Sequence, residues 1–428
     1  MPFESPEDIR REVAALEDIF NPDGGYFLCN KKKWSFMKRP PLHIIYFPIA
    51  MSTVSMGDFL LYAILPSYYP HLGLAPIQVG ILLSVNRWIR LSTNHTAEYC
   101  YRRYPSNLWL ISAFSLGSVV TIVYGLSQLF IIILFARILW GVSFSFIRQA
   151  GIMEVVNSSS DAHLGENMGY FRGITAIWRT FGLFIGGACH DLFGFSATLV
   201  GLGILSFLSV PLGALSQKKS LPIKDKPVKS ASGKKRNFGV ICCGFVLGLV
   251  GGGMIMSTLG LILKAHVGES FMIATYTIGV ATLTGFIMGL RWLVDGIGSP
   301  VIGAVADRIG RQQSIRILFP LNALVLAAVS SFTRPVPMVF FIILFFICST
   351  ALMTLLSTQA GQGGPRSVAS YATAIDLGMS VGPIIGWSIA QFEFPANSIF
   401  FSCGVIYGVG SFVAFKTFGH SVRYPYRR

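Results

Sequence analysis

The sequence is a succession of long apolar stretches, most of them near the length that crosses a membrane. About 20 helical residues span the ~30 Å of hydrocarbon in a bilayer. Backbone groups in lipid must find their hydrogen bonds within the protein, so each stretch is expected to be an α-helix. We predict twelve spans, at residues 41–66, 77–98, 107–126, 129–150, 167–189, 194–215, 238–264, 273–302, 314–333, 336–358, 368–390 and 396–417.

Composition agrees with this pattern. The 428-residue chain is 53% hydrophobic and only 12% charged, which is too apolar for a soluble protein of this length. The predicted fold class is therefore an all-α membrane protein whose surroundings are the lipid bilayer. We expect five regions: a cytosolic leader at 1–40, a six-helix bundle at 41–215, a basic linker at 216–237, a second six-helix bundle at 238–418 and a basic tail at 419–428.

Lysine and arginine residues gather on one side of the predicted membrane. The leader holds seven and the linker eight, whereas the loops on the opposite side hold only Lys264 and Arg334. Cytosolic segments of membrane proteins carry such an excess. We therefore predict a multi-pass protein of the bacterial inner membrane with both termini in the cytosol. The net charge of +15 follows from this topology and does not indicate a nucleic-acid partner.

Charged side chains inside the predicted spans are unevenly distributed. Spans one, two, four, five, eight and eleven carry them, whereas spans three, six, nine and twelve carry none away from their ends. A charge that faces lipid is costly, so these side chains should face protein or water. The candidate solute-binding residues are Arg87, Arg90, Arg137, Arg172, Arg179 and Arg291, and the candidate proton-coupling residues are Asp58, Asp295 and Asp376.

The chemistry of these side chains favours an anionic solute. A guanidinium group stays charged and offers a fork of donors that suits carboxylates and phosphates. Burial disfavours the charged form of a carboxyl group, so a membrane aspartate can carry a coupling proton. A structural interpretation stays open, because Asp58 could simply pair with a membrane arginine and Arg291 could pair with Asp295 along one helix.

The stretch from Leu290 to Arg311 ends in a short turn of glycines and charges before the next apolar run. Its spacing resembles the loop signature that follows the second and eighth helices in the major facilitator superfamily. The matching residues, which that resemblance assigns to gating, are Gly303, Asp307, Arg308, Gly310 and Arg311. The corresponding first copy, at 98–106, is altered: Glu98, Arg102, Pro105 and Ser106 replace the glycines, aspartate and final arginine.

Glycine patterns also resemble this family, in particular its drug-antiporter branch. Such spacing permits close contact between membrane helices. The candidate packing residues are Gly182 and Gly186 in the first half and Gly382, Pro383 and Gly386 in the second. The pair Arg87-Trp88 recurs as Arg291-Trp292, which indicates two related six-span units. The resemblance implies two pseudo-symmetric six-helix bundles around a central cavity.

The resemblance implies a secondary transporter that moves a small solute by alternating access, without ATP hydrolysis. We expect no enzyme activity and no cofactor, because the sequence has no phosphate-binding GxxxxGK[ST] motif. We also expect no metal site, because its histidines and cysteines are dispersed. Coupling to protons or another ion is expected. The altered first signature leaves an alternative, a membrane scaffold or sensor on the same fold that transports nothing.

The leader has a pattern of its own. Ser5, Pro6 and the following acids form a helix start, and apolar residues recur at helical spacing up to Phe20. This amphipathic helix could pack on the bundle or bind a protein partner. Chain length, the acidic leader and the altered first signature together resemble the magnetosome-associated MamH-type members of the superfamily. That resemblance would imply iron transport, as an anionic iron complex, in the magnetosome membrane.

Overall fold

The structure is a computed structural model that describes residues 42–104, 107–159, 164–216, 238–273, 276–298, 310–332 and 334–419. Residues 41–428 form one compact unit. The predicted leader helix, the linker after Ser216, and the signature residues Gly303, Asp307 and Arg308 lie outside the described residues. We refer to residues 42–216 as the first half and to residues 238–419 as the second half.

The described part of the first half consists of helices. Its elements are α3 (Leu42–Tyr68), η1 (Tyr69–Leu72), α4 (Pro76–Arg103), α5 (Asn107–Leu126), α6 (Phe130–Ser158), α7 (Leu164–Ser206) and α8 (Ser209–Ser216). Helix α7 covers most of predicted spans five and six, and Gly194 interrupts it with φ 81° and ψ 175°. Only glycine adopts this conformation readily. The interruption falls where the sequence predicts the boundary between the two spans.

The second half adds one short hairpin to its helices. Its elements are α9 (Phe238–Leu247), the π-helical η2 (Gly248–Ile255), α10 (Met256–Val267), β1 (Ser270–Ile273), β2 (Tyr276–Gly279), α11 (Val280–Leu293), the π-helical η3 (Val294–Gly298), α13 (Arg311–Ser331), α14 (Pro335–Gln362), α15 (Pro365–Gln391) and α16 (Asn397–Phe418). The predicted start of span eight at residue 273 is wrong. Strands β1 and β2 pair antiparallel there, and the helix begins at Val280.

The error has a physical reason. Residues 270–279 read SFMIATYTIG, a run of apolar and β-branched residues. Hydropathy cannot distinguish a short apolar strand from the first turns of a helix. In the structure, the backbone of residues 270–273 instead pairs antiparallel with that of residues 276–279.

Among the described residues, nine helical stretches are long and apolar enough to cross a membrane. The stretch at 167–216 contains two of the predicted spans. Helix α4 carries several charges and α11 is only 14 residues long, so neither belongs to the nine. The protein is an all-α membrane protein, and the arrangement is compatible with twelve spans.

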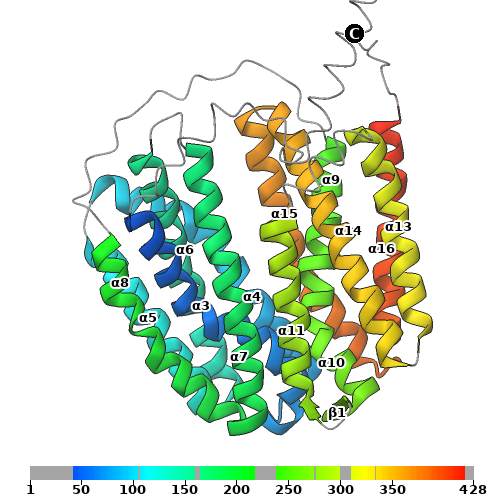
Figure 1. Cartoon of the computed structure of the whole chain (residues 1–428), viewed down its shortest axis with the longest axis horizontal. Coiled ribbons are helices and arrows are strands. Elements are labelled where there is room, and N and C mark those ends of the chain that lie inside the picture. Colours follow the sequence, from blue (N-terminus) through cyan, green and yellow to red (C-terminus); the bar gives the residue numbers. More distant parts are fainter. Residues whose placement is uncertain are drawn as a thin grey trace, which may run out of the picture. The chain divides into compact units, whose positions relative to one another are not determined.

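The two halves meet through small residues. Helices α7 and α11 lie side by side (Figure 1), and a Cβ added at Gly187 would lie 2.6 Å from the carbonyl oxygen of Ala281. Helix α4 likewise approaches α15, where a Cβ at Gly80 would lie 2.8 Å from the Cβ of Trp387. Such close backbone approach is typical of contacts between membrane helices.

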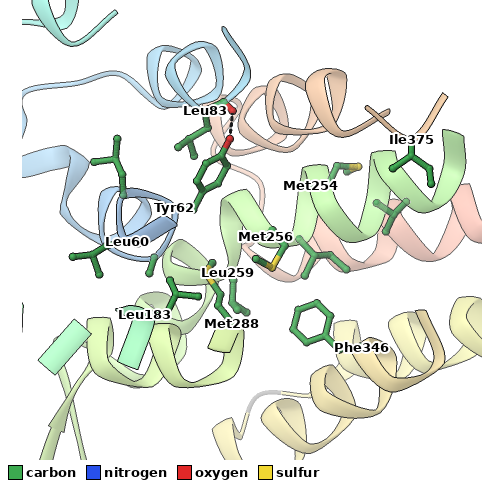
Figure 2. Close-up of a cluster of buried hydrophobic side chains, with 14 of the residues drawn as sticks. Leu60, Tyr62, Leu83, Leu183, Met254, Met256, Leu259, Met288, Phe346 and Ile375 are labelled. Atoms are coloured by element: carbon green, nitrogen blue, oxygen red, sulfur yellow. Dashed lines mark hydrogen bonds between the residues drawn. The ribbon is translucent and has the colours of Figure 1, made fainter. Parts of the chain in front are cut away.

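A continuous core lies across this junction. Figure 2 shows buried side chains from α3, α4 and α7 beside others from η2, α10, α11, α14 and α15. Its labelled members are Leu60, Tyr62, Leu83, Leu183, Met254, Met256, Leu259, Met288, Phe346 and Ile375. The charged side chains described next lie on the same helices, at or near this core.

Candidate functional site

A buried ion pair joins three helices of the first half. Arg137 of α6 contacts the Asp58 carboxylate of α3 through Nη1, and their side chains are 0% and 10% exposed. Arg137 Nε also donates to the carbonyl oxygen of Leu82 in α4 at 2.7 Å. Asn86 Nδ2 donates to the same carboxylate at 3.3 Å. The geometry matches the structural interpretation of Asp58, because pairing offsets the cost of burying both charges.

Tyr62 connects this ion pair to Arg87. Its hydroxyl donates to the carbonyl oxygen of Leu83 at 2.6 Å, as Figure 2 shows, and accepts a bond from Arg87 Nε at 3.3 Å. The guanidinium carbons of Arg137 and Arg87 lie 5.3 and 5.4 Å from the centre of the Tyr62 ring. Tyr62 therefore holds Arg87 beside a pair that is already neutralised.

Arg179 of α7 lies against two aromatic rings from different halves. Its guanidinium carbon is 4.4 Å from the ring centre of Phe59 in α3 and 4.8 Å from that of Trp292 in α11. The two rings also pack edge to face at 5.8 Å. Arg179 Nε is buried without a hydrogen-bond partner. Cation–π contacts thus position this guanidinium and leave its Nε–H without a partner.

Arg291 lies beside the same indole. Its guanidinium carbon is 5.7 Å from the ring centre of Trp292 and 5.4 Å from that of Phe346 in α14. Arg291 interacts electrostatically with Arg87 of the first half and with Asp295 of its own helical segment. Trp292 is therefore the side chain that Arg179 and Arg291 share.

A third group links α4 and α6 with α15. Arg148 Nη1 lies 3.8 Å from Asp376 Oδ2, across the two halves, and the side chains are 41% and 29% exposed. Arg90 lies 5.3 Å from the ring centre of Phe144 and keeps its Nε buried without a hydrogen-bond partner. Arg90 interacts electrostatically with Arg87, Arg148 and Asp376.

Arg148 is absent from the residues predicted to bind solute, because it lies toward one end of its span and suggests an anchor at the membrane surface. The signal that could have found it is its spacing. Arg148 follows Arg137 by eleven residues, which is close to three helical turns, so both lie on one face of α6. The aromatic partners Phe59 and Tyr62 carry no comparable signal, since their contacts come from other helices, whereas Trp292 belongs to the Arg-Trp pair that recurs in the sequence.

The structure thus shows which of the charged residues lie near one another and which do not. Five guanidinium groups lie within electrostatic reach of at least one other of the set, in α4, α6, α7 and α11: Arg87, Arg90, Arg148, Arg179 and Arg291. Asp295 and Asp376 lie among them. Arg137 is held in the buried pair, and the side chain of Arg172 is exposed, two turns before Arg179.

The predicted packing residues all lie at helix contacts. A Cβ at Gly182 would lie 2.8 Å from Met56, and one at Gly186 would lie 2.9 Å from Leu60, both in α3. Gly382 approaches Gly253 in η2, Gly386 faces Thr258, and the Pro383 carbonyl lies against Gly80. Of the gating signature, Gly310 with φ 101° and Arg311 at the start of α13 are described.

Within the described ranges, no group of three or more His, Cys, Asp or Glu side chains is arranged to hold a metal ion. The site consists instead of guanidinium groups, aromatic rings and a few carboxylates. Such a set can bind anions and exchange a proton, but it resembles no covalent catalytic arrangement.

Comparison with known proteins agrees with this geometry. Residues 47–383 match the family model of the Major Facilitator Superfamily. Multidrug resistance protein 2 of Bacillus subtilis (strain 168) is 21% identical over 374 residues, which is 84% of this chain and 92% of that protein.

Solved structures share the fold at low sequence identity. A bacterial homolog of the human lysosomal transporter Spinster, in an inward-facing and occupied conformation, has a TM-score of 0.71 at 11% identity and covers 87% of this chain and 96% of its own. The peptide transporter POT, in complex with alafosfalin, has a TM-score of 0.70 at 11% identity, with 88% and 93% covered. The nucleoside transporter NupG has a TM-score of 0.67 at 11% identity, with 88% and 100% covered. The chain belongs to the Major Facilitator Superfamily and is a secondary transporter of that family rather than an enzyme.

Proposed function

We propose that this transporter carries a small anionic solute, which binds among Arg87, Arg90, Arg148, Arg179 and Arg291. The observation that carries the proposal is that some hydrogen-bond donors of these arginines are buried without a partner. Arg90 and Arg179 each keep a buried nitrogen without a hydrogen-bond partner, and several cations repel one another across the group. A buried charge without a partner is costly, so an anion would stabilise this arrangement.

The aromatic contacts of Arg179 help to position a bound anion. Phe59 and Trp292 lie against its guanidinium group from α3 and α11, and its Nε–H is buried without a partner. A guanidinium group held in this way can donate in its own plane to a carboxylate or a phosphate. Because one of the two rings belongs to each half, movement of the halves would change the environment of this arginine, as alternating access requires.

Two predicted residues have a different place in the proposal. Arg137 is committed to Asp58, so we assign this pair a structural role and do not include it in the solute site. Arg172 is exposed and contributes, in our proposal, only to the positive field near the site. The candidates for a coupling proton are then Asp295 and Asp376, which interact electrostatically with arginines of the proposed site.

An anionic iron complex belongs to the same class of solute. The resemblance of the leader and of the altered first signature to MamH-type members motivates this candidate, together with a location in the bacterial inner membrane or the magnetosome membrane. A positive site would take up iron as a negatively charged chelate, for instance with citrate, rather than as the free cation.

The test is solute flux in vesicles containing the purified full-length protein. Labelled phosphate, benzoate and ferric citrate are compared with benzamide, a neutral analogue of benzoate, under an imposed pH gradient. We expect flux of at least one anion above that of protein-free vesicles, and no such protein-dependent flux of benzamide. Arg179→Gln should reduce that flux at least tenfold, since it removes one charge-assisted fork.

The matched control is Arg334→Gln, which removes an exposed arginine beside the start of α14 and should leave flux unchanged. Equal flux of benzoate and benzamide would remove the anion assignment. No flux of any solute, with the protein folded, would favour the scaffold or sensor alternative.

A further inference from the structure

The ion pairs Arg137–Asp58 and Arg148–Asp376 are built in opposite ways. The first is in direct contact, buried, and braced by Leu82 and Asn86. The second is 3.8 Å long, which exceeds the 2.7–2.9 Å of a charge-assisted hydrogen bond, and both of its side chains are partly exposed. A partly exposed pair gains little free energy and is easily exchanged.

Resting on the proposed function, we propose that the Asp376 carboxylate occupies an anion subsite formed by Arg90 and Arg148, and that the solute replaces it there. The solute would therefore carry a compact carboxylate or a similar oxyanion. Asp376 takes up a proton as the solute arrives, and both guanidinium groups keep their protons.

Charge balance supports this exchange. Before binding, two arginines face one carboxylate; after binding, they face one solute anion and a neutral carboxylic acid. The net charge of the subsite is unchanged, so the protein avoids the cost of an additional charge away from water. One proton should accompany each bound solute, and the charge balance is exact for a solute group that carries one negative charge.

Arg148 is the charged side chain in contact with the Asp376 carboxylate, and Arg90 of α4 interacts with it electrostatically. Of the elements that pack against α15, the described residues of α9, η2 and α14 include no charged residue. The other charged residues and histidines on elements that pack against α15 are Arg87, His95, Glu98, Arg102 and Arg103 of α4, Lys264 and His266 of α10, and Lys416 of α16. An anion that binds Arg148 therefore competes directly with the Asp376 carboxylate.

The pair also connects the halves, because α6 belongs to the first and α15 to the second. When the solute displaces Asp376, this link between α6 and α15 is lost. Solute binding and the relation between the halves would thus be coupled through one carboxylate. Such coupling is what an alternating-access carrier needs if binding is to change its conformational equilibrium.

The test measures binding and proton uptake by the full-length protein in detergent. Affinity for phosphate, acetate, benzoate and citrate is followed by thermal shift from pH 5 to pH 8, and proton uptake by an indicator dye in weak buffer. In the wild type, the affinity for at least one anion should rise as the pH falls, with about one proton taken up per bound anion.

Asp376→Asn should bind the same anion about three- to tenfold more tightly at neutral pH and lose the pH dependence, because it removes the competing charge. Arg148→Gln should weaken binding. Glu393→Gln, which changes an exposed carboxylate near the far end of α15, should leave both affinity and proton uptake as in the wild type.

The outcomes separate this inference from the proposed function. If the wild type transports anions but Asp376→Asn binds them no more tightly, or if binding takes up no proton, the displacement is wrong and the anion carrier stands. If no anion in the series binds even to Asp376→Asn, where the fork is free, both fail. Proton uptake in the wild type decides the matter should Asp376→Asn not fold.

Discussion

Arg137 is expected to stabilise the fold, because it neutralises the buried carboxylate of Asp58. Substitution Arg137→Gln leaves the Asp58 carboxylate buried without its counter-charge. We expect the free energy of unfolding to fall by about 3–5 kcal/mol. Thermal unfolding in detergent measures the change.

The double variant Arg137→Gln/Asp58→Asn should recover part of that loss, since no isolated charge remains. An equal loss in the single and double variants would contradict the importance of charge and indicate that packing alone is responsible.

Trp292 acts on the site through other residues. It lies against Arg179 and Arg291, so Trp292→Leu removes two cation–π contacts. A contact of this kind contributes about 0.5–2 kcal/mol. The half-saturation constant for a transported anion should rise about three- to tenfold, with a smaller change in maximal flux.

Trp292→Phe keeps an aromatic face and should stay close to the wild type. A similar rise in both variants would mean that the size of the indole matters and its π face does not.

At the scale of elements, the contact between α7 and α11 depends on the absence of side chains. A Cβ at Gly285 would collide with the carbonyl oxygen of Leu183, a backbone atom that cannot rotate away. We therefore expect Gly285→Ala to destabilise the protein by about 1–3 kcal/mol. Thermal unfolding and transport rate are the measurements.

Gly201→Ala is the matched control, because a Cβ there would meet nothing within 4 Å. Alanine favours helix over glycine by up to about 1 kcal/mol, so this variant should be neutral or slightly more stable. Equal destabilisation of both variants would exclude close helix approach as the cause.

At the scale of the whole molecule, polar contacts hold the halves together where α3 and α10 end and α11 begins. Asp191 Oδ2 accepts bonds from the backbone N–H of Thr282 at 2.8 Å and from its hydroxyl at 2.5 Å. Lys264 Nζ donates to the carbonyl oxygen of Ser67 at 2.9 Å. An alternating-access cycle has to break these contacts when this end opens.

Asp191→Ala removes the acceptor of two bonds between the halves, each a contribution of about 1 kcal/mol. The conformers in which this end is open should become at least fivefold more populated. Spin labels at the exposed positions Phe193 and Phe392, in a background without native cysteines, report the distance between the halves.

Thr282→Val removes one bond and keeps the backbone donor, so its shift should be smaller. An unchanged distance distribution in Asp191→Ala would show that these bonds do not hold the end closed.

The sequence by itself determined that this protein lies in a lipid bilayer and that charged groups lie within its membrane-spanning helices. Apolar runs must be helices in a bilayer, and charges on spans one, two, four, five, eight and eleven must avoid lipid. These are local constraints that each segment carries alone. For this reason the helix positions, the boundary at Gly194 and most of the arginines of the site could be predicted.

Only the tertiary structure decided which charges are neutralised by a buried ion pair and which are not. Asp58 and Arg137 are 79 residues apart, and nothing in either helix specifies that they pair, whereas Arg148 meets Asp376 from the other half. The hairpin at Ser270–Gly279 likewise depends on pairing between strands that hydropathy does not encode. A charge becomes structural or functional through its neighbours in space, and these are set by the packing of helices that are distant in sequence.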